Sequence, residues 1–218
     1  MAQQILKPDD QTTAGEWKPD RRIGKRIREE FGRFPNFDEW RPGDLLLFHD
    51  PRWFSFVSRL IVWAQRDGYG SNHARWHHAA VYVGDGFVCE ASMIGGVRRL
   101  PLHAYVGKHW IRVRRDSRLS ELDGYKIAIR AMTRLGQSYD FGAILLLIGQ
   151  LIGGLWKRPT LALNFKGAIC SRLYEIAYWG VARRILYDTD GMPIIPAELS
   201  ITDELVDVTV CWRKIASG

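Results

Sequence analysis

Short runs between residues 44 and 114, most of them apolar, predict the strands of a β-sheet. They occupy residues 44–48, 78–83, 87–91, 96–100 and 110–114. Runs of this length, bounded by turn residues, are typical of strands. Because Gly84-Asp85-Gly86 joins the second run to the third as a hairpin turn would, we expect the sheet to be antiparallel.

Other segments carry apolar residues at every third or fourth position, which is the spacing of an amphipathic helix. These segments are residues 53–65, 119–135 and 170–178. We expect a loop over residues 185–199, which contain Pro193 and Pro196, and a final strand at residues 207–215. The pattern therefore predicts an α+β fold, with one domain over residues 41–218.

Residues 1–40 lack this periodicity and are rich in basic residues and proline. We expect an extended arm that packs loosely on the domain, with one short basic helix over residues 21–31. The formal net charge of +7 suggests an acidic partner, such as nucleic acid, anionic lipid or a bacterial wall polymer. Nucleic acid is the weakest of the three, because the arm has no interleaved aromatic residues and no known nucleic-acid motif follows it.

Residues 141–156 are the most apolar stretch of the chain. They are fewer than the roughly 20 residues that span a membrane, and Gln150 interrupts them. We interpret them as a buried core helix, and the alternative is a helix that enters a membrane surface or covers an acyl-binding groove. The first residues lack the apolar core of a signal peptide, so we expect synthesis in the cytoplasm without Sec-type export.

The three cysteines, Cys89, Cys170 and Cys211, lie far apart and form no CxxC pair, so neither a disulfide framework nor a zinc ribbon is predicted. Cys170 differs from the other two because it opens a predicted helix. Unpaired N–H groups and the positive end of the helix dipole stabilise a thiolate at this position. Cys170 is therefore our candidate nucleophile, and the alternative is a small buried residue of the helix.

His78 is our candidate for the general base, because it opens the small apolar run that ends at Gly84. His77 is the alternative, since adjacent strand residues point to opposite faces of a sheet. A base of this kind needs a polar partner that orients its ring. Glu90 is our first candidate for that partner, with Asp44 and His103 as the others.

The hairpin register decides whether Glu90 reaches His78. If the loop is the three residues Gly84-Asp85-Gly86, Val83 pairs with Phe87 and Ala80 with Glu90. His78 and Glu90 then share a face as near-diagonal neighbours. If the loop is only Asp85-Gly86, the parity changes and the two side chains point apart. We expect the first register.

A zinc site is a competing interpretation of His73, His77, His78 and Cys89. A His-x-x-x-His pair binds zinc when both residues lie on one face of a helix. The turn residues before Ser71 and the strand that starts at His78 argue against a helix there. We therefore expect no metal at these residues.

Several short motifs follow one another in a recognisable order. They are the Gly-Asp-Leu strand at residues 43–45, the His78 strand, the Glu-Ala strand at residues 90–91, the Tyr-Asp loop at residues 139–140 and the Cys-Ser-x-Leu helix at residues 170–173. Over residues 41–215, this order resembles the circularly permuted branch of the NlpC-type papain-like cysteine hydrolases. That branch is the YiiX-like group, with the lecithin:retinol acyltransferase group nearby.

The resemblance implies a permuted papain-like fold, in which an antiparallel sheet packs against helices and the nucleophile stands at a helix N-terminus. By the matching motifs, Cys170 is the nucleophile, His78 the general base and Glu90 the third polar residue. Tyr139 matches a loop position near the cleft. We also assign Tyr139, Asp44 and Ser171 to substrate binding.

The function expected from this resemblance is a cysteine hydrolase that cleaves an amide bond through a thioester intermediate. The acyl transfer that it implies needs neither a metal nor an organic cofactor. Bacterial cell-wall peptide is the substrate we expect, which implies delivery by a phage or a secretion system. One alternative is a lipid acyltransferase or phospholipase with the same nucleophile. Another is a non-enzymatic module that binds anionic polymers.

Overall fold

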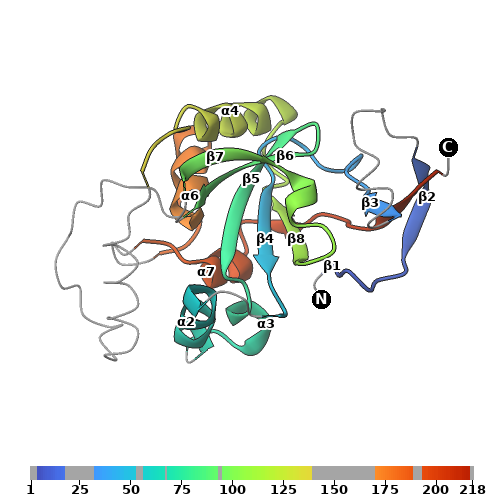
Figure 1. Cartoon of the computed structure of the whole chain (residues 1–218). Coiled ribbons are helices and arrows are strands. Elements are labelled where there is room, and N and C mark those ends of the chain that lie inside the picture. Colours follow the sequence, from blue (N-terminus) through green and yellow to red (C-terminus); the bar gives the residue numbers. More distant parts are fainter. Residues whose placement is uncertain are drawn as a thin grey trace.

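The computed structural model describes residues 4–17, 32–52, 56–66, 68–92, 95–138, 170–188 and 193–216. These residues form an α+β fold, as the sequence predicts, in which helices cover one face of an antiparallel sheet (Figure 1). A smaller sheet and the loops beside it pack on the other face. None of the described helices combines the length and the apolar character that crossing a bilayer requires.

The main sheet has the order β1-β8-β4-β5-β6-β7 in the described residues, and β9 also pairs with β8. All its pairs are antiparallel. Its strands are β1 (Ile5–Leu6), β4 (Leu45–His49), β5 (His78–Gly84), β6 (Phe87–Ser92), β7 (Gly96–Pro101), β8 (Trp110–Arg115) and β9 (Val206–Asp207). The five strands predicted between residues 44 and 114 are therefore confirmed.

The central strand β4 is buried over its whole length because both faces of the sheet are covered. Leu45 and Leu47 belong to the core beneath the helices, whereas Leu46 and Phe48 belong to the core on the opposite face. Side chains of successive strand residues point to opposite faces. A continuous apolar run is thus what a central strand between two cores requires.

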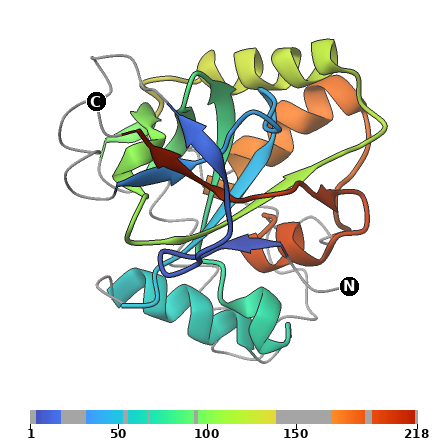
Figure 2. The same cartoon turned by 90° about the vertical axis from the view of Figure 1, so that its right-hand side faces the viewer.

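Two helices, α4 (Glu121–Met132) and α6 (Cys170–Ala182), lie side by side on one face of the sheet (Figures 1 and 2). The hydroxyl of Ser120 accepts a hydrogen bond from the N–H of Asp123, and the carboxylate of Asp123 accepts one from the N–H of Ser120. This capping box explains why the helix starts there and not at residue 119. The inner faces of the two helices pack into the core through buried residues such as Ile127 and Leu173.

Three shorter helices, α2 (Phe56–Arg66), α3 (Ser71–Ala74) and α7 (Pro196–Ile201), gather at one end of the sheet (Figure 1). The side chain of Gln65 joins them, since its amide donates to the carbonyls of Ala74 and Trp76 and accepts from the N–H of Ala197. The prediction of a loop over residues 185–199 is wrong for α7. Pro196 occupies the first turn of this helix, where proline needs no N–H partner.

The second sheet joins β2 (Thr13–Trp17), β10 (Trp212–Ile215) and β3 (Arg33–Pro35) in that order. The predicted final strand is thus two strands, β9 and β10. Much of the predicted arm is extended but not loosely packed, because β1 joins the main sheet and Leu6 is fully buried. The short helix predicted over residues 21–31 and the apolar residues 141–156 lie outside the described residues.

The β5–β6 hairpin combines a two-residue turn with a β-bulge. Asp85 and Gly86 form the turn with positive φ angles of 51° and 72°. The register shifts between Tyr82 and Gly84, so Gly84 and not Val83 is opposite Phe87, while Ala80 is opposite Glu90. The predicted Ala80–Glu90 pair is therefore present, but the predicted three-residue loop is wrong. The extra residue of the bulge restores the parity that a two-residue turn would otherwise change.

Candidate active site

Cys170 is the first residue of α6, at the helix end where backbone N–H groups have no partner within the helix. Its side chain is buried, and it shares a hydrogen bond with the imidazole of His78. The backbone N–H groups of Ala79 and Ser171 also donate to its sulfur. The sulfur is thus surrounded by donors that favour a negative charge.

The N–H of Ala79 is available to the sulfur of Cys170 because the pairing of β5 with β6 begins only at the next residue, Ala80. The outermost pair at this end of the two strands is Ala80–Glu90. Ala79 is paired only with Leu47 of β4, on the other side. The end of the ladder therefore leaves room for the first residue of α6, and His78 lies at the same place.

His78 connects Cys170 to Glu90. Its Nε2 atom lies 2.7 Å from Oε2 of Glu90, and only 18% of its side chain is exposed. Since Nε2 faces the carboxylate, Nδ1 is the ring nitrogen that remains for the thiol of Cys170. A carboxylate, an imidazole and a thiol thus form one hydrogen-bonded chain.

Glu90 is almost completely buried, and both of its oxygens have partners besides His78. The guanidinium of Arg98 contacts Oε1, with Nε at 3.0 Å and Nη2 at 2.9 Å. The hydroxyl of Tyr105 donates to Oε2. A buried carboxylate with this many donors keeps its charge and one fixed orientation.

Glu90, His78 and Cys170 strongly shift one another's pKa values. Burial alone would raise the pKa of Glu90, but His78, Tyr105 and Arg98 lower that pKa to about 2. Burial would likewise lower the pKa of His78, but Glu90 and the hydrogen bond with Cys170 raise it to about 10. Burial opposes a thiolate at Cys170, yet His78 and the two backbone N–H groups hold its pKa below the ordinary range. The favoured state is an imidazolium-thiolate pair.

Aromatic rings hold His78 in place. Tyr105 stacks on Phe48 with ring centroids 3.9 Å apart, and it lies nearly parallel to the His78 ring at 6.1 Å. Phe48 is opposite His78 in the β4–β5 register. Tyr105 therefore fixes both the imidazole and the carboxylate that orients it.

His77 has different surroundings from His78. Its Nε2 accepts a hydrogen bond from the N–H of Asp50, and its ring lies near those of His49 and His109. Burial is the main factor that lowers the pKa of His77 to about 3 and the pKa of His109 to about 4. His77 is thus neutral, and its Nε2 is occupied by a backbone group.

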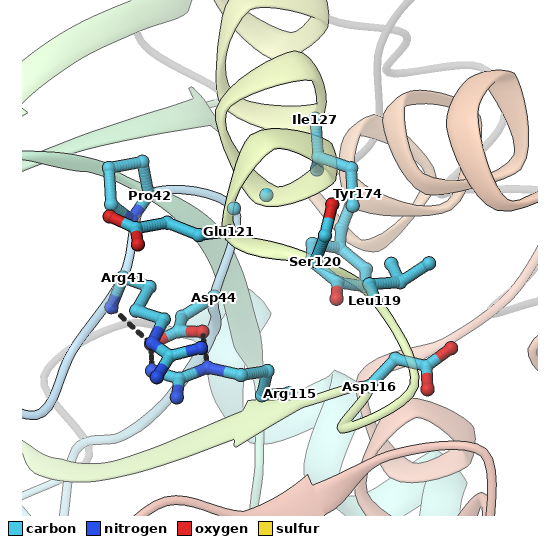
Figure 3. Close-up of a pocket in the computed structure, with 12 residues that line it drawn as sticks. Arg41, Pro42, Asp44, Arg115, Asp116, Leu119, Ser120, Glu121, Ile127 and Tyr174 are labelled. Atoms are coloured by element: carbon cyan, nitrogen blue, oxygen red, sulfur yellow. Dashed lines mark hydrogen bonds and ion pairs between the residues drawn. The ribbon is translucent and has the colours of Figure 1, made fainter.

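The other predicted site residues are not all gathered at this site. The carboxylate of Asp44 binds the guanidinium of Arg115, with Oδ1–Nε at 2.6 Å, and accepts from the N–H of Arg41. This pair borders a hollow next to the start of α4 (Figure 3). The hydroxyl of Ser171 donates to the carbonyl of Ile194, so only its backbone N–H faces Cys170.

Two further assignments can be placed only in part. Tyr139 lies outside the described residues. His103, considered as an orienting group, is exposed in the short 3-10 helix η1 (Leu102–Ala104). In the part of the chain that the structure describes, no three His, Cys, Asp or Glu side chains are arranged to hold a metal ion. His73, from the competing zinc interpretation, lies in α3 with Nδ1 2.9 Å from the hydroxyl of Ser200.

Arg98 and Tyr105 were not predicted from the sequence. Arg98 is directly opposite Glu90 in the β6–β7 register, so an opposite-charge cross-strand pair was a signal that could have identified it. Tyr105 directly follows η1, and no periodic pattern marks it.

No model of a known protein family matches the chain, and no curated protein matches it either. The site therefore has to be interpreted from its own geometry.

Proposed function

We propose that this protein is a cysteine hydrolase in which Cys170, His78 and Glu90 are the nucleophile, the general base and the orienting carboxylate. The observation that supports this most strongly is the hydrogen-bonded chain from Glu90 through His78 to a cysteine at a helix N-terminus. A nucleophile, a base and an orienting group in this order are what acyl transfer requires.

The reaction follows from the charges of the three groups. The thiolate of Cys170 attacks the carbonyl carbon of an amide, and the N–H of Cys170 helps to stabilise the oxyanion. The imidazolium of His78 gives its Nδ1 proton to the leaving amine, and a thioester forms. His78 then takes a proton from water, which attacks the thioester and releases the acid. Glu90 keeps its charge throughout and stabilises the imidazolium.

The proposal includes membership of the permuted papain-like hydrolases. It is supported by the order of the residues, with His78 before Cys170, and by an antiparallel sheet that supplies the histidine while a helix supplies the cysteine. We propose an amide of bacterial cell-wall peptide as the substrate, because the net charge of +7 suits an anionic wall.

An acyl ester of a lipid is the second candidate substrate for the same nucleophile. Leu122 and Ile129 of α4 are apolar and exposed, which favours contact with lipid. A lipid acyltransferase or phospholipase would form the same thioester at Cys170.

The first test is the labelling of the folded protein with iodoacetamide at pH 6.5. We expect Cys170 to react, whereas Cys89 stays unreactive because burial raises its pKa to about 12. His78→Ala should slow the labelling of Cys170 at least about tenfold, since the imidazolium that stabilises the thiolate is lost. Wall peptides and lipid esters are then offered to wild type and Cys170→Ala. An unreactive Cys170 in a folded protein would leave only the non-enzymatic binding module.

A further inference from the structure

The helix α4 is apolar on two opposite sides. Ile127, Ala128 and Ala131 face the core, as expected for a helix on a sheet. On the solvent side, Leu122 is 63% and Ile129 is 55% exposed, and Tyr125 lies between them. The spacing of three and four residues places these three side chains in one stripe. A helix that is apolar on both sides normally has a partner on both sides.

The neighbouring helix α6 continues this surface. Trp179 is 50% exposed, and the guanidinium of Arg183 lies 4.9 Å from the centre of its ring. Ile176 lies one turn before Trp179, so these two side chains share one side of α6, and Arg183, just past the end of the helix, joins them through its contact with the Trp179 ring. An indole covered by a guanidinium is both apolar and cationic.

Arg130 joins the two helices. A Cβ atom on Gly180 of α6 would lie only 2.7 Å from Nη1 of Arg130, so the guanidinium crosses from α4 onto the backbone of α6 where a side chain is lacking. Since α4 and α6 also lie side by side (Figure 2), their exposed sides form one continuous surface. We name it the α4–α6 face. It comprises Leu122, Tyr125, Ile129, Arg130, Trp179 and Arg183.

The charge of this face is positive. In the part of the chain that the structure describes, neither Arg130 nor Arg183 forms an ion pair with a carboxylate. Two of the acidic residues nearby, Glu121 and Asp123, lie in the first turn of α4, and Asp123 is bound to Lys126 at 2.9 Å. The third, Glu175 of α6, lies one turn before Trp179. The α4–α6 face thus combines apolar side chains with two guanidinium groups that can bind an anion.

We propose that the α4–α6 face docks on a bilayer that contains anionic phospholipid. Leu122, Ile129 and Trp179 would enter the boundary between headgroups and acyl chains, while the guanidinium groups bind lipid phosphates. A second copy of the chain fits less well, because a symmetric contact would bring the same arginines together without carboxylates between them. The docking does not depend on the chemistry of Cys170, so it extends the proposed function and does not rest on it.

The test is co-sedimentation of the full chain with two kinds of vesicle. One is phosphatidylcholine alone, and the other contains about 30% phosphatidylglycerol, which gives the membrane a negative surface potential. We expect the protein to bind the anionic vesicles, and to bind the neutral vesicles at least about tenfold more weakly. Leu122→Ser with Ile129→Ser should weaken binding to anionic vesicles at least about tenfold. Arg130→Gln with Arg183→Gln should weaken it by about the same factor, and should largely remove the preference for anionic vesicles.

Matched variants separate this face from the rest of the surface. Ile201→Ser with Val206→Ser removes two other exposed apolar residues, and Arg59→Gln with Arg66→Gln removes two exposed arginines of α2. Both should bind as wild type does. Cys170→Ala should also bind normally, so a failure of the hydrolase proposal is distinguishable. Far-ultraviolet circular dichroism establishes that each variant is folded.

Three results would overturn the proposal. The first is an absence of binding to anionic vesicles. The second is binding that the variants of the α4–α6 face leave unchanged, which would point to the basic residues of the first 40 positions instead. The third is a dimer in analytical ultracentrifugation that the same variants dissociate, which would make this face a contact between two copies.

Discussion

The Nε2 atom of His78 lies 2.7 Å from a carboxylate oxygen of Glu90, although the two residues are not opposite each other in the sheet. Glu90 is opposite Ala80, so His78 lies two residues further along the same face. Near-diagonal side chains in antiparallel strands are close enough for long side chains to touch. The bulge between Tyr82 and Gly84 determines this geometry, because without its extra residue the two-residue turn would place the side chains on opposite faces.

Labelling of Cys170 should depend little on pH. Its pKa is lowered and that of His78 is raised to about 10, so the thiolate persists below the usual thiol range and is lost only when acid protonates it. We expect the rate of reaction with iodoacetamide to change less than about threefold between pH 6 and 9. The labelling rate of a small free thiol changes by about tenfold per pH unit below its pKa.

Glu90→Gln should restore an ordinary pH dependence. Without the carboxylate charge, burial lowers the pKa of His78, and the thiolate loses its counter-ion. The labelling rate at pH 6 should fall at least about tenfold and then rise with pH. Glu39→Gln, at an exposed position, is the control and should match wild type. A flat profile in Glu90→Gln would show that the carboxylate does not control His78.

Tyr105→Phe should keep the ring stack on Phe48 but remove one hydrogen bond to Glu90. A hydrogen bond to a charged group contributes about 1.5–3 kcal/mol, so we expect the free energy of unfolding to fall by about that amount. The pKa of Glu90 should also rise, which shifts the acidic limb of the labelling profile to higher pH. Tyr125→Phe, on the exposed side of α4, should change neither quantity. A stability loss without the shift in the profile would limit Tyr105 to a structural role.

Gly43→Ala should destabilise the fold severely. Gly43 has a φ angle of +91°, and a Cβ atom there would lie 2.4 Å from the carbonyl oxygen of Gly124 in α4. The strained conformation and the backbone clash together should lower the free energy of unfolding by more than about 3 kcal/mol in urea denaturation. Gly136→Ala shares the positive φ but has open space around it, so it should cost about 1 kcal/mol. Equal losses in the two variants would contradict the close approach.

Arg114→Met should be another strongly destabilising change. The buried guanidinium donates to the carbonyls of Leu199, Thr202 and Leu205 and thereby fixes the segment that follows α7. Methionine fills a similar volume but leaves these acceptors unpaired, at a cost of about 3–5 kcal/mol. Arg213→Met breaks the exposed pair with Asp38 and should cost less than about 1 kcal/mol in the same thermal unfolding experiment. A small effect at Arg114 would mean that water replaces its hydrogen bonds.

The sequence was most informative where the signal is local. The short runs of β4 to β8 predict the strands, and the turn residues after Val83 predict the hairpin that carries His78 and Glu90. The sequence could indicate the site because two of its three main residues stand at a recognisable boundary, Cys170 at the start of a helix and His78 at the start of a strand.

The elements that escaped prediction depend on distant partners. β1, β2 and β3 have between two and five residues each, and their pairing with β8 or β10 is encoded nowhere nearby. The bulge was missed for another reason, since its extra residue follows from how the strand ends pack and not from the composition of the turn. Pro196 was taken as a loop signal, although proline is equally compatible with the first turn of α7.

The pairing of early strands with late ones has a consequence for synthesis on the ribosome. β2 and β3 can pair only after β10 has been synthesised. β8 pairs with both β1 and β9, and its pairing with β9 forms only when the C-terminal part has been made. His78 and Glu90 are made long before Cys170, so a nascent chain carries the base and its carboxylate without a nucleophile. Under the proposed function, the growing polypeptide stays inactive until Cys170 has left the exit tunnel, and its unpaired strand edges need protection until then.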